Sequence, residues 1–153
     1  MKKFLLLVLC AVSLTMCLTA CGDSSSTADI SLSEQQKTDL LKTANSNAKL
    51  VFTTANNYAA DFIADGKIVD KLDYTGPVDE LPDSNSLSKP IQTALEEVCG
   101  DDCGYICIKF DPSAEDGNFA QWSEKESGSP VGQYPNPQKT YDKSIEITLG
   151  EKA

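Results

Sequence analysis

Three regularly spaced cysteines, Cys99, Cys103 and Cys107, are the residues of this chain best suited to chemistry. Neighbouring thiols can form disulfides, bind a metal or take part in redox reactions. Structural zinc requires four ligands, but this region offers three thiols, and the sequence contains neither histidine nor a Cys-x-x-Cys motif. We therefore predict a structural role for these cysteines and expect no metal or other cofactor.

Two disulfide pairings are open at this spacing. If Cys103 and Cys107 lie on one strand, roughly 13 Å separates them at the usual rise per residue, whereas a disulfide needs Cα atoms about 4.4–6.8 Å apart. Cys99 must then take part in any pair. A Cys99–Cys103 bond would close the turn at residues 100–102, and a Cys99–Cys107 bond would join a helix to a strand. We favour the first.

The oxygen-rich stretch at residues 111–118 invites comparison with a calcium-binding loop. It departs from the EF-hand pattern, because the sixth position holds Asp116 instead of glycine and the twelfth holds Trp122 instead of glutamate. A solvated hairpin turn is the favoured interpretation.

Two acidic pairs, Glu96-Glu97 and Asp101-Asp102, are the remaining candidates for catalysis. Neighbouring acids on a helix do not face each other across a cleft, as the two carboxylates of a glycosidase do. The absence of histidine also removes the usual serine and cysteine triads. We therefore predict that the protein is not an enzyme.

Residues 1–20 have the layout of a signal peptide. Lys2 and Lys3 precede the apolar run at residues 4–9, and the segment ends at a small residue, Ala20. Polar residues dilute its second half, whereas a membrane-spanning helix needs about 20 mostly apolar residues. The pattern predicts an exported protein.

The tetrapeptide Leu18-Thr19-Ala20-Cys21 resembles the lipobox of bacterial lipoproteins, which ends in the modified cysteine. The resemblance implies that Cys21 receives a diacylglycerol group and becomes the first residue of the mature chain. Cys10 and Cys17 lack a small residue before them. Residues 21–30 then form a lipid-bearing, Ser-rich tether. We expect an extracytoplasmic domain, held at the cell membrane by its lipid anchor.

The net charge of the exported chain limits the classes of molecule that it can bind. Removing Lys2 and Lys3 with the leader lowers the basic count from 13 to 11, against 23 acidic residues, for a net charge near −12. A protein this acidic has no basic footprint for phosphates, so nucleic acid is excluded as a partner. Anionic lipid head groups would repel it as well.

A long helix at residues 33–65 is the strongest structural prediction. Ser31 with Glu34, or Ser33 with Gln36, offers a capping box, and Gly66 can end the helix. The spacing of three and four between apolar positions predicts one buried stripe. This stripe consists of Leu40, Leu41, Ala44, Ala48, Val51, Phe52, Ala55, Tyr58, Ala59, Phe62 and Ile63.

The rest of the chain predicts a loop at residues 67–89 with a short strand at 67–72, and then a short helix. Ser88 can cap that helix, Pro90 fits its first turn, and Gly100 ends it. Alternating residues predict strands at 105–110, 119–123 and 144–149. The predicted buried face of the short helix is Ile91, Ala94, Leu95 and Val98. These elements predict one α+β domain at residues 31–153, with the long helix packed on a small antiparallel sheet.

This order of elements resembles the type IV pilin-like fold. The stretch Ala44-Asn45-Ser46-Asn47-Ala48-Lys49 is similar to the helix of pilin-like proteins from Gram-positive anaerobes. Gly104-Tyr105, residues 120–123 and residues 131–135 are similar to the sheet of the same group. Unlike pilins, this chain has a lipobox and a tether where a prepilin peptidase site would stand. The resemblance implies a role in surface assembly or adhesion.

The sequence therefore favours a non-catalytic surface module that binds surface proteins or cell-wall components. The loop at residues 127–140 is the predicted contact, with Gln133, Tyr134 and Pro135 as candidate binding residues. Equally open is a structural role, in which the loop covers the sheet and Tyr134 is buried. The alternative functions are a small solute-binding lipoprotein and, as the weakest, a secreted hydrolase.

Overall fold

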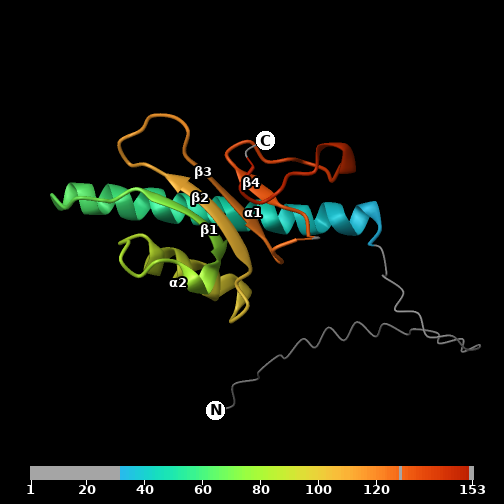
Figure 1. Cartoon of the computed structure of the whole chain (residues 1–153), viewed down its shortest axis with the longest axis horizontal. Coiled ribbons are helices and arrows are strands. Elements are labelled where there is room, and N and C mark those ends of the chain that lie inside the picture. The colour runs from blue at the N-terminus through green and yellow to red at the C-terminus, as the bar shows by residue number, and fades with distance from the viewer. Residues whose placement is uncertain (1–31, 128, 152–153) are drawn as a thin grey trace, which may run out of the picture. The chain divides into compact units, whose positions relative to one another are not determined.

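The computed structural model describes residues 32–127 and 129–151, so the predicted signal peptide, Cys21 and the tether lie outside the described residues. Helix α1 (Glu34–Ala64) lies across one face of a four-stranded antiparallel sheet (Figure 1). The strands β1 (Leu72–Pro77), β2 (Tyr105–Phe110), β3 (Phe119–Ser123) and β4 (Gly132–Tyr134) follow one another in that order across the sheet. The predicted α+β class, with a long helix on a small antiparallel sheet, is confirmed.

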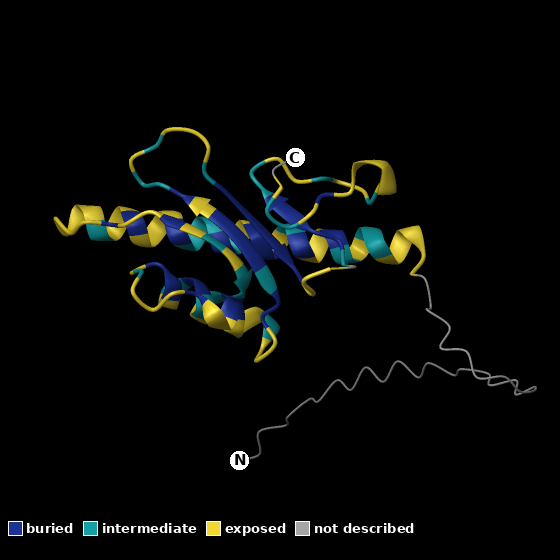
Figure 2. Cartoon of the chain, viewed as in Figure 1, coloured by how far each residue is buried: buried dark blue, intermediate teal, exposed yellow. Residues whose placement is uncertain are grey.

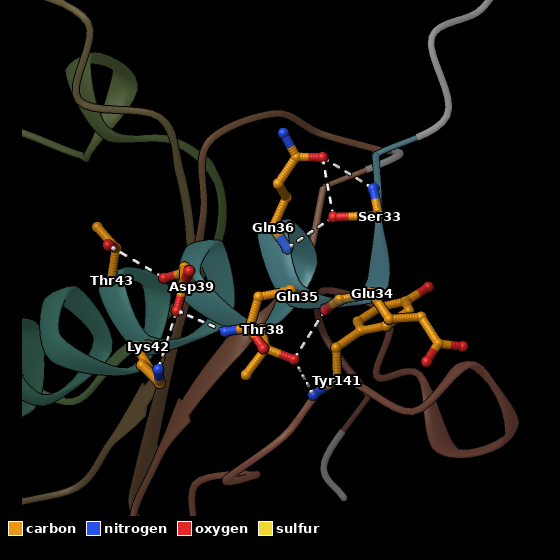
Figure 3. A network of polar contacts seen from close by, with 9 residues as sticks. All are labelled: Ser33, Glu34, Gln35, Gln36, Thr38, Asp39, Lys42, Thr43 and Tyr141. Atoms are coloured by element: carbon orange, nitrogen blue, oxygen red, sulfur yellow. Dashed lines mark hydrogen bonds and ion pairs between the residues drawn. The ribbon is translucent and has the colours of Figure 1, made fainter.

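Helix α1 begins at one of the two predicted capping boxes. The Ser33 hydroxyl accepts a bond from the Gln36 amide at 3.3 Å, and the Gln36 side chain accepts one from the Ser33 amide at 2.9 Å (Figure 3). Gly66 ends the helix in a left-handed conformation, with φ at 72°. Its buried stripe consists largely of small residues, which let the helix approach the sheet closely: Leu41, Ala44, Asn47, Ala48, Val51, Ala55 and Ala59.

Two members of the predicted stripe are exposed, and three are half-buried: Leu40, Phe52 and Phe62. Tyr58 is 44% exposed and Ile63 is 54% exposed, because the last turns of α1 extend beyond the sheet (Figure 2). Phe52 is half-buried, with its ring 5.2 Å from that of Tyr134. The helix is therefore packed along its middle and open at its far end.

The face of the sheet towards α1 is apolar. Ile106 and Ile108 on β2, with Trp122 on β3, belong to the same core cluster as the helix stripe. On β4, a Cβ added at Gly132 would lie 2.0 Å from the Ala44 carbonyl carbon. Glycine is therefore required here by direct contact between helix and strand backbones.

The opposite face of the sheet is polar, and it is buried from Cys107 towards β4, whereas Asp73, Thr75 and Lys109 are exposed. Cys107, Gln121 and Gln133 are register partners on neighbouring strands, and each is at most 1% exposed. The Gln121 side chain accepts a bond from the Gly150 amide and donates one to the Glu151 carbonyl, both at 2.7 Å. These bonds hold the last described residues of the chain over this face.

The predicted strand at residues 144–149 is wrong. A 3-10 helix, η2 (Lys143–Ile145), occupies its start, where the Asp142 carboxylate accepts a bond from the Ser144 amide at 2.8 Å. β4 takes the place beside β3 at the sheet edge. The following residues bond to Gln121 instead of pairing with a strand. Of the alternating apolar residues, Ile147 is buried and Ile145 is 59% exposed.

Two local predictions also need correction. The short strand expected at 67–72 is β1, which begins at Leu72 and runs to Pro77. The short helix is α2 (Ser88–Cys99), but Ser88 does not cap it: the buried Ser88 hydroxyl donates to the Pro82 carbonyl at 2.8 Å. Ile91 and Leu95 are buried as predicted, whereas Val98 is 61% exposed because it lines an open groove. A second 3-10 helix, η1 (Val78–Glu80), follows β1.

Candidate binding groove

An open groove of about 450 Å³ lies where α1, the end of α2 and the end of β3 meet. A shallower hollow of about 360 Å³ continues it along α1 towards Leu32, since both are lined by Leu40 and Thr43. We call this continuous surface the α1 groove. It is lined by Leu32, Gln36, Asp39, Leu40, Thr43, Asn47, Val98, Cys99, Asp102, Trp122, Glu124, Ser129 and Pro130.

The floor of the α1 groove is apolar and rigidly held. The Trp122 indole N–H donates to the Cys103 carbonyl at 2.8 Å, which fixes the ring under the groove. Val98 is 61% exposed and Leu32 is 40% exposed. Exposed apolar side chains gathered in a hollow of this kind are typical of a binding surface.

The helix that forms one wall of the groove is fastened at its start. The Thr38 hydroxyl accepts a bond from the Tyr141 amide at 3.3 Å (Figure 3). The Lys37 amine donates to the Tyr141 hydroxyl at 3.2 Å. Asn45 donates to the Gln138 carbonyl at 2.7 Å and accepts from the Gln133 amide at 3.0 Å. These bonds tie α1 to β4 and to the segment after it, so both hold this wall of the groove in place.

The rim of the groove is acidic. Asp39, Asp102 and Glu124 contribute carboxylates, and no lysine is among the lining residues. Asp39 is paired with Lys42 at 2.9 Å, and hydrogen bonds from Lys42 and Gln35 lower the pKa of its carboxyl group. In the described part of the chain, Asp102 and Glu124 take part in no ion pair. Within the described residues, Asp102 and Glu124 are therefore the two rim carboxylates whose negative charge no ion pair neutralises.

One predicted site residue, Cys99, lines this groove. The Asn47 amide donates to its sulfur at 3.4 Å, and burial raises the pKa of the Cys99 thiol. Burial, followed by the neighbouring Cys99, also raises the pKa of Cys103, whose thiol donates to the Gly100 carbonyl at 3.0 Å. Thiols kept protonated in this way are poor nucleophiles and poor metal ligands.

The third thiol is separated from the other two. Cys107 is fully buried on the polar face of the sheet, and burial raises its pKa too. Cys103 belongs to the core on the α1 side, and Cys99 packs against that core. All three are free thiols in the structure. The Cys99–Cys103 disulfide stays a prediction, and the position of Cys107 across the sheet speaks against pairing it with Cys99.

The candidate contact residues of the loop are mostly occupied inside the molecule. The Gln133 side chain is 1% exposed and bonds to Gln121 at 3.1 Å and to the Pro135 carbonyl at 3.2 Å. The half-buried Tyr134 ring packs on Phe52, with the Lys49 amine 5.9 Å from its centre. Pro135 is half-buried. Gln133 is therefore buried away from any partner, whereas the half-buried Tyr134 leaves both roles open, contact with a partner and cover of the sheet.

In the oxygen-rich turn after β2, the side-chain oxygens of Asp111 are engaged by other residues of the protein. Asp111 accepts bonds from the Ser113 amide and hydroxyl, and pairs with Lys71 at 2.6 Å. The hydrogen bond from Lys71 is the main reason that the pKa of Asp111 is lowered to about 2. In residues 32–127 and 129–151, no group of three or more Cys, Asp or Glu side chains is arranged to hold a metal ion.

Sequence reasoning missed the α1 groove. Its lining comes from stretches far apart in the chain, and no short motif or periodicity connects Leu40 with Val98 or Pro130. The signal that could have revealed it was the presence of apolar residues at the edges of the apolar stripes of α1 and α2. Periodicity assigned these residues to the core.

Comparisons with known proteins identify no relative. No protein-family model matches the chain, and searches of curated proteins and of solved structures return no match. Within the described ranges, no helix combines the length and the apolar character needed to cross a membrane.

Proposed function

We propose that this protein is a lipid-anchored, extracytoplasmic interaction module that binds a protein partner through the α1 groove. The observation that carries this proposal is the groove itself. It combines an apolar floor with exposed Val98 and Leu32, held by two helices and a strand. Fully burying side chains of this kind contributes about 1.5–3 kcal/mol each, enough for a few contacts to support specific binding.

A non-catalytic role is supported by the chemistry of the groove. Its thiol, Cys99, has a raised pKa, and one of its three carboxylates, Asp39, is paired with Lys42, while Asp102 and Glu124 have no histidine beside them to act as a base. A nucleophile needs an adjacent base or a lowered pKa. The lining residues therefore favour recognition over reaction.

The anchor is the part of the proposal that rests on the sequence. Cys21, at the end of the complete lipobox match, precedes Leu32 by a short Ser-rich stretch, so the groove would operate close to the membrane surface. Intact-mass analysis of the membrane-extracted protein should give a mature chain that starts at a diacylglycerol-modified Cys21. An unmodified mature chain in the culture medium would refute the anchor.

Partner capture by surface cross-linking tests the groove. Val98→Ser should leave the melting temperature within about 2 °C, because exposed substitutions rarely change stability, and should abolish capture of the partner. Ile68→Ser is the matched control, since Ile68 is 90% exposed and does not line the groove. Equal capture by both variants would show that the groove is not the binding site.

A small solute is the second candidate occupant, because about 450 Å³ lies within the range of small-molecule sites. In that case a small molecule should raise the melting temperature of the wild type and not that of Val98→Trp, which fills the groove. Capture of a protein at the groove, without any such small-molecule response, would exclude this alternative.

A further inference from the structure

We infer that the partner of the α1 groove is a basic, apolar-centred segment of another protein: a short stretch of aliphatic residues flanked by lysine or arginine. This inference rests on the proposed function, since it specifies what the groove binds. Two observations support it: the charges around the groove, and the charges around the other exposed apolar surface of the chain.

The arrangement of the lining sets what can fill the groove. Leu40, Val98 and Trp122 provide apolar surface, while Asp102 and Glu124 stand at the rim. Neither carboxylate takes part in an ion pair within the described residues. An apolar segment with cations at its ends would bury aliphatic side chains on the floor and place positive charges beside the two acids.

A second copy of this chain is a poor occupant. Outside the groove, its exposed large apolar residues are Tyr58, Ile63 and Ile68 at the far end of α1, and Ile145 in η2, which stands beside the exposed acids Asp142 and Glu146. The far end of α1 is the larger of these surfaces. That end carries Asp61, Asp65 and Asp70, all exposed, and its cation Lys67 is held by Asp65 at 3.1 Å. Docking it into the α1 groove would bring acidic groups against the acidic rim, and like charges placed together oppose association.

An anionic lipid surface is excluded by the same reasoning. Phosphate head groups would meet Asp102 and Glu124 with no lysine among the lining residues to bind them. Of the lysines that adjoin lining residues in sequence, Lys42 is already engaged by Asp39 at 2.9 Å, and the others, including Lys125 next to Glu124, do not line the groove. The chemistry of the rim therefore selects a positively charged protein segment.

Direct binding of synthetic peptides tests the inference. The full chain carrying Cys21→Ser, which cannot be lipidated, is titrated into two labelled peptides with the same leucine-rich centre, and binding is followed by fluorescence anisotropy. One peptide has lysines at both ends and the other has glutamates. The lysine peptide should bind at least about tenfold more tightly, and its affinity should fall as salt is raised. Equal affinities, or tighter binding of the glutamate peptide, would overturn the inference.

Matched charge variants locate the binding. Asp102→Asn combined with Glu124→Gln should weaken binding of the lysine peptide about tenfold, and Val98→Ser should weaken it by a similar factor. Asp61→Asn combined with Asp70→Asn removes the same charge at the far end of α1 and should change affinity less than twofold. A similar loss in both charge variants would mean non-specific attraction to an acidic protein, and would overturn the inference.

Failure of this inference is distinguishable from failure of the groove. If Val98→Ser abolishes capture of the cellular partner while the two peptides bind equally, the groove stands and the basic partner is wrong. If Val98→Ser leaves both capture and peptide binding unchanged, the groove itself is wrong.

Discussion

Both faces of the sheet have a buried centre, and the two centres are closed by different means, although Asp73, Thr75 and Lys109 on the face away from α1 are exposed. Towards α1, Ile106 and Ile108 are fully buried among apolar side chains. On the other face, Cys107, Gln121 and Gln133 are also at most 1% exposed, under the last described residues of the chain. Burial of the first face releases water from apolar surface, whereas burial of the second removes polar groups from water.

The difference shows how a polar layer can be closed without a large penalty. Among the described residues, no buried side-chain nitrogen or oxygen is left without a hydrogen-bond partner. The Gln121 side chain makes hydrogen bonds to three residues, Gln133, Gly150 and Glu151. Close packing of side chains stabilises the apolar face, and hydrogen bonds stabilise the polar face. Substitutions on the two faces should therefore lower the free energy of unfolding for different reasons.

The largest effect is expected on the apolar face. Ile108→Ala removes a fully buried side chain opposite α1 and should lower the free energy of unfolding by about 2–5 kcal/mol, measured by urea titration. Lys109→Ala, at the exposed neighbouring position, is the control and should stay within about 0.5 kcal/mol. A loss below about 1 kcal/mol for Ile108→Ala would contradict tight packing of this face.

A smaller loss is expected on the polar face. Gln121→Ala leaves the Gly150 amide and the Gln133 side chain without this partner, and should cost about 1–3 kcal/mol in urea unfolding. Amide hydrogen exchange at Gly150 should also become faster, because the bond that protects it is gone. Unchanged exchange in a destabilised variant would show that Gln121 does not hold the terminal segment.

This contrast explains how far the sequence could predict the fold. Period-two alternation located β2 because its apolar residues meet an apolar helix face. The same rule assigns Gln121 and Gln133 to a solvated face, since it does not distinguish a polar residue in water from one bonded under a covering segment. The covering segment was mistaken for a strand because its isoleucines alternate in the same way.

The candidate site was harder to predict than the fold. Cys99 was found from its residue type, but the groove depends on side chains that meet only after α1, α2 and β3 have packed. The composition of residues 127–140 predicts an exposed loop, but Gln133 and Tyr134 belong to β4 and only Pro135 follows the strand. Their contacts are long-range, for example from Gln133 to Asn45, and such contacts leave no local pattern.

The thiols provide a third test of the two faces. Oxidation of the protein with glutathione disulfide should link Cys99 to Cys103 and leave Cys107 free, as read by peptide mapping without reduction. Each bond formed releases reduced glutathione as the acceptor of the two electrons and two protons. Closing so short a loop should stabilise the fold by at most about 2 kcal/mol.

Two outcomes would contradict this arrangement. Three free thiols after oxidation would reject the pairing. A Cys99–Cys107 link would show that the two sheet faces are not separated as described, because these residues lie on opposite sides of β2. Cys107→Ser is the matched control, and should leave the Cys99–Cys103 product unchanged.

The smallest effect is expected in the hairpin between β2 and β3, where an exposed ion pair takes the place of packing. The pKa of Asp111 is lowered from 3.8 to about 2, chiefly by the hydrogen bond from Lys71. Because the folded state holds this carboxylate ionised more strongly than the unfolded state does, its stabilisation is present above about pH 4 and is lost as the pH falls towards 2. Asp111→Asn should therefore unfold more easily than the wild type at pH 7, and the difference should shrink steadily as the pH falls from 4 to 2. Asp116→Asn, in the same turn, is the control, since Asp116 makes none of these bonds within the described residues. Urea unfolding midpoints measured across this pH range test the assignment. The same Asp111→Asn difference at pH 7 and at pH 2 would contradict it, because a loss independent of pH would come from the shape of the turn and not from the charge of its carboxylate.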